Sequence, residues 1–101
     1  LLAQFDAVLA PAFGCAAFAH DDRPDWEQRV LNIDGVPTPY GAQGAWSSFA
    51  SLAGLPATVV PVAQDAQGLP LGVQVIGPWL HDLGTIDVAA RIGAHSAGAA
   101  V

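Results

Sequence analysis

The sequence predicts a layered α/β fold to which this chain contributes about three strands and two main helices. Its apolar runs are short and continuous, as in strands that are covered on both faces, and they alternate with segments of helical period. Charged residues make up only 12% of the chain, where about a quarter is typical, and residues 35–64 contain none. A free-standing domain of this size leaves roughly 35–40% of its unfolded surface in water and needs charge to stay soluble. We therefore expect the rest of the sheet to lie outside these 101 residues.

The first strand is expected at residues 5–11, where the apolar residues are consecutive and Pro11 ends the run. Residues 12–39 have no clean period, and six of the nine residues 21–29 are charged, so this portion is expected to be a variable loop at the surface. Trp26 and the apolar residues 30–33 are expected to hold it down as a short helix followed by an extended piece. A connection this long exceeds the roughly 12–15 residues usual for a structureless loop.

Residues 41–53 fit a helix, because their apolar residues recur at spacings of three and four. These are Ala42, Ala45, Trp46, Phe49, Leu52 and Ala53. Gly54 then stands where a left-handed residue caps a helix, and Pro56 prevents the helix from continuing.

Residues 54–78 are expected to form an antiparallel strand-turn-strand hairpin, opened by one Gly-Leu-Pro triplet and interrupted by a second. Its strands are residues 57–62 and 71–76, and Pro61 indicates an edge strand or a bulge. Gly72 and Gly77 indicate close approach of other backbone.

The last element is expected to be a helix over residues 82–95 with Asp82 as its N-cap. Its small and apolar face is expected to pack on the sheet, and consists of Leu83, Ile86, Ala89, Ala90 and Gly93. The Ala/Gly-rich residues 96–101 are expected to fray.

Charge and composition argue against several partners and locations. The net charge is −6, with three arginines and no lysine, so the chain has no basic patch for nucleic acid or an anionic membrane surface. The uncharged stretch contains four prolines and cannot form a membrane-spanning helix of about 20 residues. Cys15 is alone and cannot form an internal disulfide, which favours the cytoplasm. The absence of Met, together with the start Leu1-Leu2, favours translation that begins upstream.

No catalytic or metal-binding constellation stands out. Ser47 and Ser48 fall in the middle of the expected helix, without the sharp turn that exposes a nucleophilic serine. The histidines have neither helical zinc spacing nor cysteine partners, and the acidic residues of 21–27 fit a solvated face. No glycine-rich phosphate loop opens a helix, so no metal and no cofactor is expected.

The order of these segments resembles the C-terminal portion of the amidase signature family. The resemblance rests on FDAVLAPAF at 5–13, YGAQGAWSSFASLAGLPATVVPV at 40–62 and GLPLGVQVIGP at 68–78, followed by an Asp-led helix. It spans roughly residues 5–94, and its most specific part is the repeated Gly-Leu-Pro that ends in Gly72-Val73-Gln74.

The resemblance implies an α/β enzyme with a large mixed sheet between helices, which hydrolyses amides with a Ser–Ser–Lys triad. That triad lies upstream of the region matched, and this chain has no lysine to serve as the base. Residues 1–101 would then be the C-terminal fragment of a single amidase domain, inactive alone. Its implied partners are the N-terminal part of the same polypeptide, a small-molecule amide substrate and, for the full-length enzyme, a second copy as a homodimer.

The resemblance also places four residues near the substrate cavity, namely Phe13, Tyr40, Trp46 and Gln74. Packing is the favoured role of each of the three aromatics, and a structural hydrogen bond is the favoured role of Gln74. Two alternative functions stay open. One is a fragment of an amidotransferase A subunit that feeds ammonia to misacylated tRNA, and the other is a stand-alone, non-catalytic module that binds a partner through its sheet edge.

Overall fold

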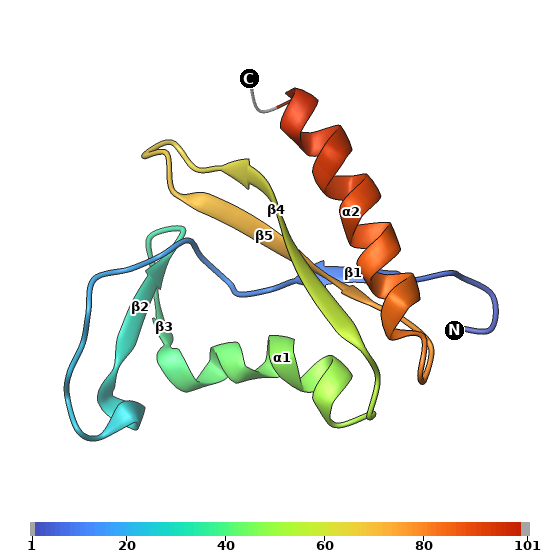
Figure 1. Ribbon diagram of the computed structural model, residues 1–101. Coiled ribbons are helices and arrows are strands. Elements are labelled where there is room, and N and C mark those ends of the chain that lie inside the picture. The colour runs from blue at the N-terminus through green and yellow to red at the C-terminus, as the bar shows by residue number, and fades with distance from the viewer. Residues whose placement is uncertain (1, 100–101) are drawn as a thin grey trace.

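The computed structural model describes residues 2–99 of the chain and has two helices and two small sheets (Figure 1). β1, β5 and β4 form an antiparallel sheet in that order, and β2 and β3 form a separate hairpin. The elements in chain order are β1 (Val8–Pro11), the 3-10 turn η1 (Trp26–Gln28), β2 (Val30–Ile33), β3 (Val36–Pro39), the 3-10 turn η2 (Tyr40–Gln43), α1 (Gly44–Ser51), β4 (Ala57–Gln64), β5 (Pro70–Ile76) and α2 (Asp82–Ala99). The α/β class, the three-stranded sheet and the two helices confirm the prediction.

The transition from α1 to β4 follows from Gly54. Its φ of 67° is left-handed, the Leu55 amide donates to the Ala50 carbonyl at 3.0 Å, and the Gly54 amide donates to the Ser51 carbonyl at 3.3 Å. This pair of hydrogen bonds is the Schellman cap, which satisfies carbonyls that the helix end leaves free. The first Gly-Leu-Pro therefore ends the helix, as its residues predict, and β4 begins at Ala57.

β4 and β5 pair antiparallel around a turn organised by Asp65. Its Oδ1 accepts from the Gln67 amide at 2.8 Å and the Leu69 amide at 2.9 Å, while Gly68 adopts a φ of 82°. A register shift between Pro61 and Ala63 marks a bulge on β4, which is an edge strand. The proline thus lies where a missing amide does not interrupt a central ladder.

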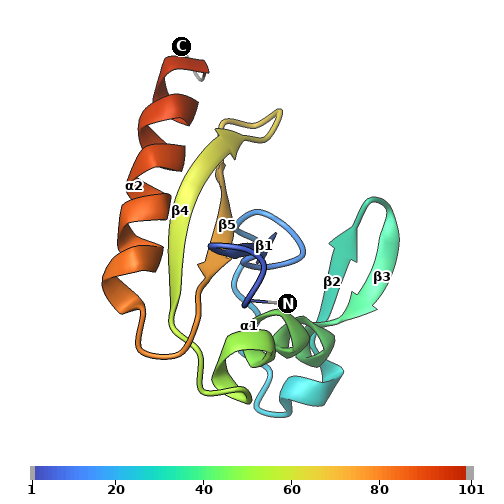
Figure 2. The ribbon, with the colours of Figure 1, turned by 90° about the vertical axis from the view of Figure 1, so that its right-hand side faces the viewer.

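Residues 12–39 have more regular structure than the sequence led us to expect. Besides the short turn η1 they contain the hairpin β2–β3, which stands apart from the main sheet (Figure 2). Its two-residue loop is Asp34 and Gly35, with φ of 52° and 79°. Asp-Gly supplies the two positive φ values of a hairpin turn whose twist matches that of the strands. This dipeptide is a local sequence signal for the hairpin, which the prediction of a variable loop did not use.

α2 packs beside β4 with a face that overlaps only in part with the one expected (Figure 2). Ala89 is buried and a Cβ on Gly93 would be 3.1 Å from a Val60 methyl group, so these two residues face the sheet as predicted, together with the buried Thr85. The prediction is wrong for the other three residues of the expected face, since Leu83 is 82% exposed, Ile86 is 53% exposed and Ala90 is also exposed. Small side chains face the sheet because they allow the helix to approach it closely.

α2 begins at Asp82 as expected, but Asp82 is the first helical residue and not the N-cap, because the His81 carbonyl accepts the first helical hydrogen bond, from the Thr85 amide at 3.1 Å. The helix runs on to Ala99 instead of ending near residue 95. Of the tail expected to fray, residues 100–101 lie outside the described residues. Nowhere in residues 2–99 is a helix both long enough and apolar enough to cross a membrane.

The buried core is small for a chain of this length. Among the described residues the buried apolar side chains are Leu31, Ala50, Val75, Ile76 and Ala89. Leu9 of β1 and Val59 of β4 are 57% and 60% exposed, so the strands are not covered on both faces within this chain. The accessible surface of 7045 Å² exceeds the roughly 5,400 Å² expected of a compact protein of this mass. The radius of gyration of 15.2 Å likewise exceeds the roughly 13 Å typical of 100 residues.

Candidate functional site

Three aromatic side chains from different segments meet near the start of η2. The Phe13 and Phe18 rings stack with centroids 5.7 Å apart, and the Tyr40 ring lies 6.4 Å from Phe13 and 6.0 Å from Phe18. Aromatic pairs prefer such offset and tilted contacts at 4.5–7 Å. The cluster holds the segment that follows β1 against the end of β3.

Arg29 contacts the Tyr40 ring of this aromatic cluster and also the backbone of Arg23. Its guanidinium lies 5.9 Å from the centre of the Tyr40 ring, and its Nε and Nη2 donate to the Arg23 carbonyl at 3.0 and 2.7 Å. Arg23 in turn donates through Nε to both carboxylate oxygens of Asp21, at 2.9 and 3.1 Å. Hydrogen bonds therefore join Asp21, Arg23 and Arg29 into a local network, and residues 22–28 are exposed, as expected of a solvated face.

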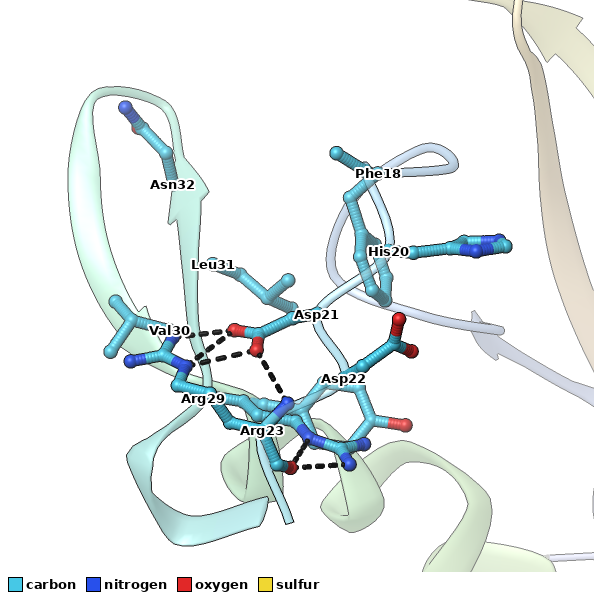
Figure 3. A pocket seen from close by; sticks show the side chains of 11 residues that line it. Phe18, His20, Asp21, Asp22, Arg23, Arg29, Val30, Leu31 and Asn32 are labelled. Atoms are coloured by element: carbon cyan, nitrogen blue, oxygen red, sulfur yellow. Dashed lines mark hydrogen bonds and ion pairs between the residues drawn. The ribbon is translucent and has the colours of Figure 1, made fainter. Parts of the chain in front are cut away.

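Between this network and β2 lies a hollow with a volume of about 910 Å³. Figure 3 shows the side chains around it and the ion pair at its edge. It is lined by Phe18, Ala19, His20, Asp21, Asp22, Arg23, Arg29, Val30, Leu31, Asn32 and Tyr40. Small-molecule sites usually occupy about 300–1,000 Å³ and combine apolar walls with a few polar groups. The hollow has both properties.

The carboxyl of Asp21 is the group whose charge this arrangement most affects. Side-chain hydrogen bonds from Arg23 favour the ionised form and lower its pKa from 3.8 to about 2. Because the pKa is lowered on folding, the ion pair contributes fully above about pH 4 and is lost as pH falls through about 2.

We expect a carboxyl carbon NMR titration of Asp21 to show a midpoint near pH 2. In the variant Arg23→Gln the midpoint should rise toward 3.8, since the donor that stabilises the anion is gone. If the titration midpoint of Asp21 in the unsubstituted protein already lies near 3.8, the hydrogen bonds from Arg23 do not stabilise its carboxylate as described.

Trp46 and Gln74, the other two candidates, are joined by a hydrogen bond between α1 and β5. The Gln74 Nε2 donates to the Trp46 carbonyl at 2.7 Å and to the Pro11 carbonyl at 2.9 Å, and the residue is only 4% exposed. The Trp46 ring is tilted against Phe49, with centroids 6.2 Å apart. The Gln74 amide nitrogen is thus committed to joining β5, β1 and α1, which is the structural role favoured from sequence.

Of the four candidates, the structure brings Phe13 and Tyr40 together, and they share a second hollow of about 340 Å³ with Gln43 and Ser47. Sequence reasoning missed Phe18 and Arg29, which lie in the segment treated as a variable loop. It also missed Gln43, whose buried Oε1 accepts from the Gly14 amide at 2.8 Å.

The side chains with nucleophilic or metal-binding chemistry form no reactive cluster in residues 2–99. The Ser47 and Ser48 hydroxyls donate back to the Gly44 carbonyl at 3.1 and 2.8 Å, as helix-interior serines often do. No group of three or more His, Cys, Asp or Glu side chains in the described residues is placed to hold a metal ion. The Ser47 hydroxyl beside the smaller hollow is thus held by its own helix.

Comparisons with known proteins cover most of the chain. The family model described as Amidase matches residues 1–85. The A subunit of the glutamyl-tRNA(Gln) amidotransferase of Nitrobacter winogradskyi is 37% identical over 75 residues, 74% of this chain and 13% of the relative. The corresponding protein of a Wolbachia strain from Drosophila simulans is 37% identical over 89 residues, 88% of this chain and 16% of the relative. That of Cereibacter sphaeroides is 38% identical over 78 residues, 76% and 14% respectively. The chain therefore spans about a sixth or less of the length of these relatives.

Proposed function

Because the chain belongs to the amidase family, as the resemblance in its sequence indicated, we propose that it is the C-terminal part of a longer enzyme that cleaves the C–N bond of a small-molecule amide. The observation that carries the proposal is the family match over residues 1–85, in a chain that covers only 13–16% of three relatives. The exposed apolar strands, the large surface and the extended shape support it, since they fit a piece of a larger domain.

The chemistry would be acyl transfer through a serine outside these residues. The serine oxygen forms a bond to the amide carbon, the C–N bond breaks, and the serine proton passes through a lysine base to the leaving nitrogen. Water then hydrolyses the acyl-enzyme. The absence of lysine from these 101 residues requires that the base be supplied elsewhere in the polypeptide.

This chain would contribute framework and part of the substrate pocket. The aromatic cluster of Phe13, Phe18 and Tyr40 and the hollow beside it have the volume and mixed polarity to take one side of an amide substrate. Gln74 would act on the pocket only through its hold on β1 and α1.

Replacing Tyr40 with leucine is expected to raise KM about tenfold with little change in kcat, because an aromatic contact of about 1.4 kcal/mol would be lost equally from the bound substrate and the transition state. The measurement is steady-state hydrolysis by the complete polypeptide, meaning this chain joined to the rest of its family domain. Phe5→Leu, at an exposed aromatic that lines neither hollow, is the matched control. Equal effects of the two substitutions would remove Tyr40 from the proposed pocket.

A second candidate function is favoured by the relatives themselves. All three are named as A subunits of a glutamyl-tRNA(Gln) amidotransferase, so this chain could belong to an enzyme that releases ammonia from glutamine for use on tRNA. Partner subunits would then be required for full activity.

The experiment that tests both begins with the coding sequence upstream of Leu1. It is expected to contain a lysine followed by a Gly-Ser-Ser-Gly-rich segment in the same reading frame. The complete polypeptide is then assayed for ammonia release from simple amides and anilides, and from glutamine with and without glutamylated tRNA. Hydrolysis of simple amides without tRNA supports the amidase; dependence on tRNA and partner subunits supports the amidotransferase. An upstream sequence without the lysine and serine segment contradicts both.

A further inference from the structure

The helix α2 presents three different faces around its axis. Thr85, Ala89 and Gly93 face the sheet: the first two are buried, and Gly93 closely approaches Val60. The Thr85 Oγ1 donates to the Asp82 carbonyl at 2.8 Å and lies 2.9 Å from the Thr58 Oγ1 of β4, which fixes the rotation of the helix on the sheet.

A second face is apolar and uncovered. Leu83 is 82% exposed, Ile86 is 53% exposed, and Ala90 is also exposed. At about 100° per residue these three positions fall within about 60° of one another, and their centre lies about 90° from the middle of the sheet-facing side. We call this set, Leu83, Ile86 and Ala90, the α2 flank.

The third face is the one suited to water. Asp87 and Arg91 form an exposed ion pair at 3.0 Å, and His95 continues the same side of the helix. A helix that covers a sheet and otherwise faces solvent needs only one apolar stripe, about 100° wide. On α2 the apolar side continues from the sheet-facing residues through the α2 flank, about 160° in all, which is wider than contact with the sheet alone requires.

The approach to α2 adds to the uncovered apolar surface. Trp79 and Leu80 are each 69% exposed, and Leu80 has a φ of 63°, a left-handed conformation that a bulky side chain disfavours. The two residues are the centre of a turn in which the His81 amide donates to the Pro78 carbonyl at 3.0 Å.

We propose that the α2 flank is a helix-packing surface, covered by a helix from the remaining part of the same polypeptide. This rests on the proposed function, in which this chain is a small part of a longer enzyme. Residues spaced i, i+3 and i+7 form the kind of row through which helices pack with axes 8–10 Å apart. Because the charged face points away from both the sheet and the flank, the partner helix lies beside α2 in the same layer.

The remaining polypeptide is a better occupant than a second copy of this chain. The matched regions are only 13–16% of the relatives, so most of such an enzyme lies outside these residues. Three side chains of one helix offer far less than the roughly 800 Å² per partner of a stable interface. A surface of three side chains is enough for a contact between two helices of one domain, but it is too small to hold two separate chains together.

The test is cysteine labelling with a maleimide. Leu83→Cys and the matched control Arg91→Cys are each made in a Cys15→Ser background, in the complete polypeptide and in the 101-residue chain. In the complete polypeptide Leu83→Cys should react at least about 100-fold more slowly than Arg91→Cys, because labelling must wait for local opening. In the 101-residue chain, which is not expected to fold cooperatively, the two should react at rates within about fivefold of each other, which shows that the two thiols do not differ intrinsically. Ile86→Cys repeats the test in case the first variant does not fold.

Equal rates in the complete polypeptide would overturn the inference. Protection in the 101-residue chain that rises with concentration, together with a dimer in sedimentation, would assign the flank to a second copy and overturn it as well. Assaying the same polypeptide for amide hydrolysis separates the two proposals. Slow labelling without turnover overturns only the proposed function, and turnover with fast labelling overturns only the helix contact.

Discussion

Replacing Gln74 with leucine is expected to lower the free energy of unfolding of the complete polypeptide by about 2–4 kcal/mol, since a buried carbonyl that loses its donor costs roughly 1–3 kcal/mol. Gln74 is 4% exposed, and its amide nitrogen donates to the Pro11 and Trp46 carbonyls. Leucine fills a similar volume but donates to neither. The measurement is chemical denaturation followed by tryptophan fluorescence.

Gln64→Leu is the matched control, because Gln64 is a strand glutamine of β4 that is exposed. Its substitution should change the stability by no more than about 0.5 kcal/mol. If both variants are equally stable, the buried amide does not join β5 to β1 and α1 as described.

The second large effect is expected at Gly77, where the chain leaves β5 for α2. A Cβ at this position would lie 2.4 Å from the Thr85 Cγ2 and 3.7 Å from the His81 carbonyl oxygen. Thr85 cannot turn away freely, because it is β-branched, buried and hydrogen-bonded to Asp82. Gly77→Ala should therefore destabilise the complete polypeptide by about 1–3 kcal/mol through overpacking.

Two further variants separate this clash from an unrelated effect of alanine. Gly84→Ala lies in α2 with only an ordinary contact to His81, so it should stabilise by about 0.5–1 kcal/mol through helix propensity. Thr85→Ser removes the methyl group but keeps the hydroxyl, so in combination with Gly77→Ala it should recover much of the loss. A double variant as unstable as the sum of its single changes would show that the methyl group is not the obstacle.

The parts of the fold that were predicted correctly depend on local chemistry. Gly54 ends α1 through its left-handed backbone, and Asp82 favours the start of α2 as an acidic residue in the first turn, near the positive end of the helix dipole. The hairpin turn at Asp34 and Gly35 also has a local signal, the dipeptide Asp-Gly. It was not predicted, because the charged residues before it indicated a solvated loop.

The side of α2 that faces the sheet could not be read from hydropathy. Leu83 and Ile86 are the most apolar residues at the start of the helix, yet Thr85, Ala89 and Gly93 make the contact. The distance between helix and sheet decides this, and that distance depends on Gly77 and Val60 from elsewhere in the chain. Hydropathy predicted that apolar residues of the helix pack against other parts of the protein, but it did not predict which of them contact the sheet.

The residues of the candidate site were likewise predicted only in part. Phe13 and Tyr40 were selected through the family resemblance, and the structure places them in contact. Phe18 and Arg29 complete the cluster from a segment without periodicity, so only the three-dimensional path of residues 12–29 reveals them. The role of these residues in binding substrate stays a prediction until the variants are measured.

Thermal unfolding of the 101-residue polypeptide, made alone and followed by circular dichroism and calorimetry with an anilide assay alongside, tests most directly whether the chain is part of a larger domain. Since the strands and the α2 flank are uncovered, we expect a broad, non-cooperative change or aggregation, and no hydrolysis. A sharp, reversible two-state transition together with turnover of the anilide would mean that the chain is a complete enzyme, which contradicts its assignment as a fragment.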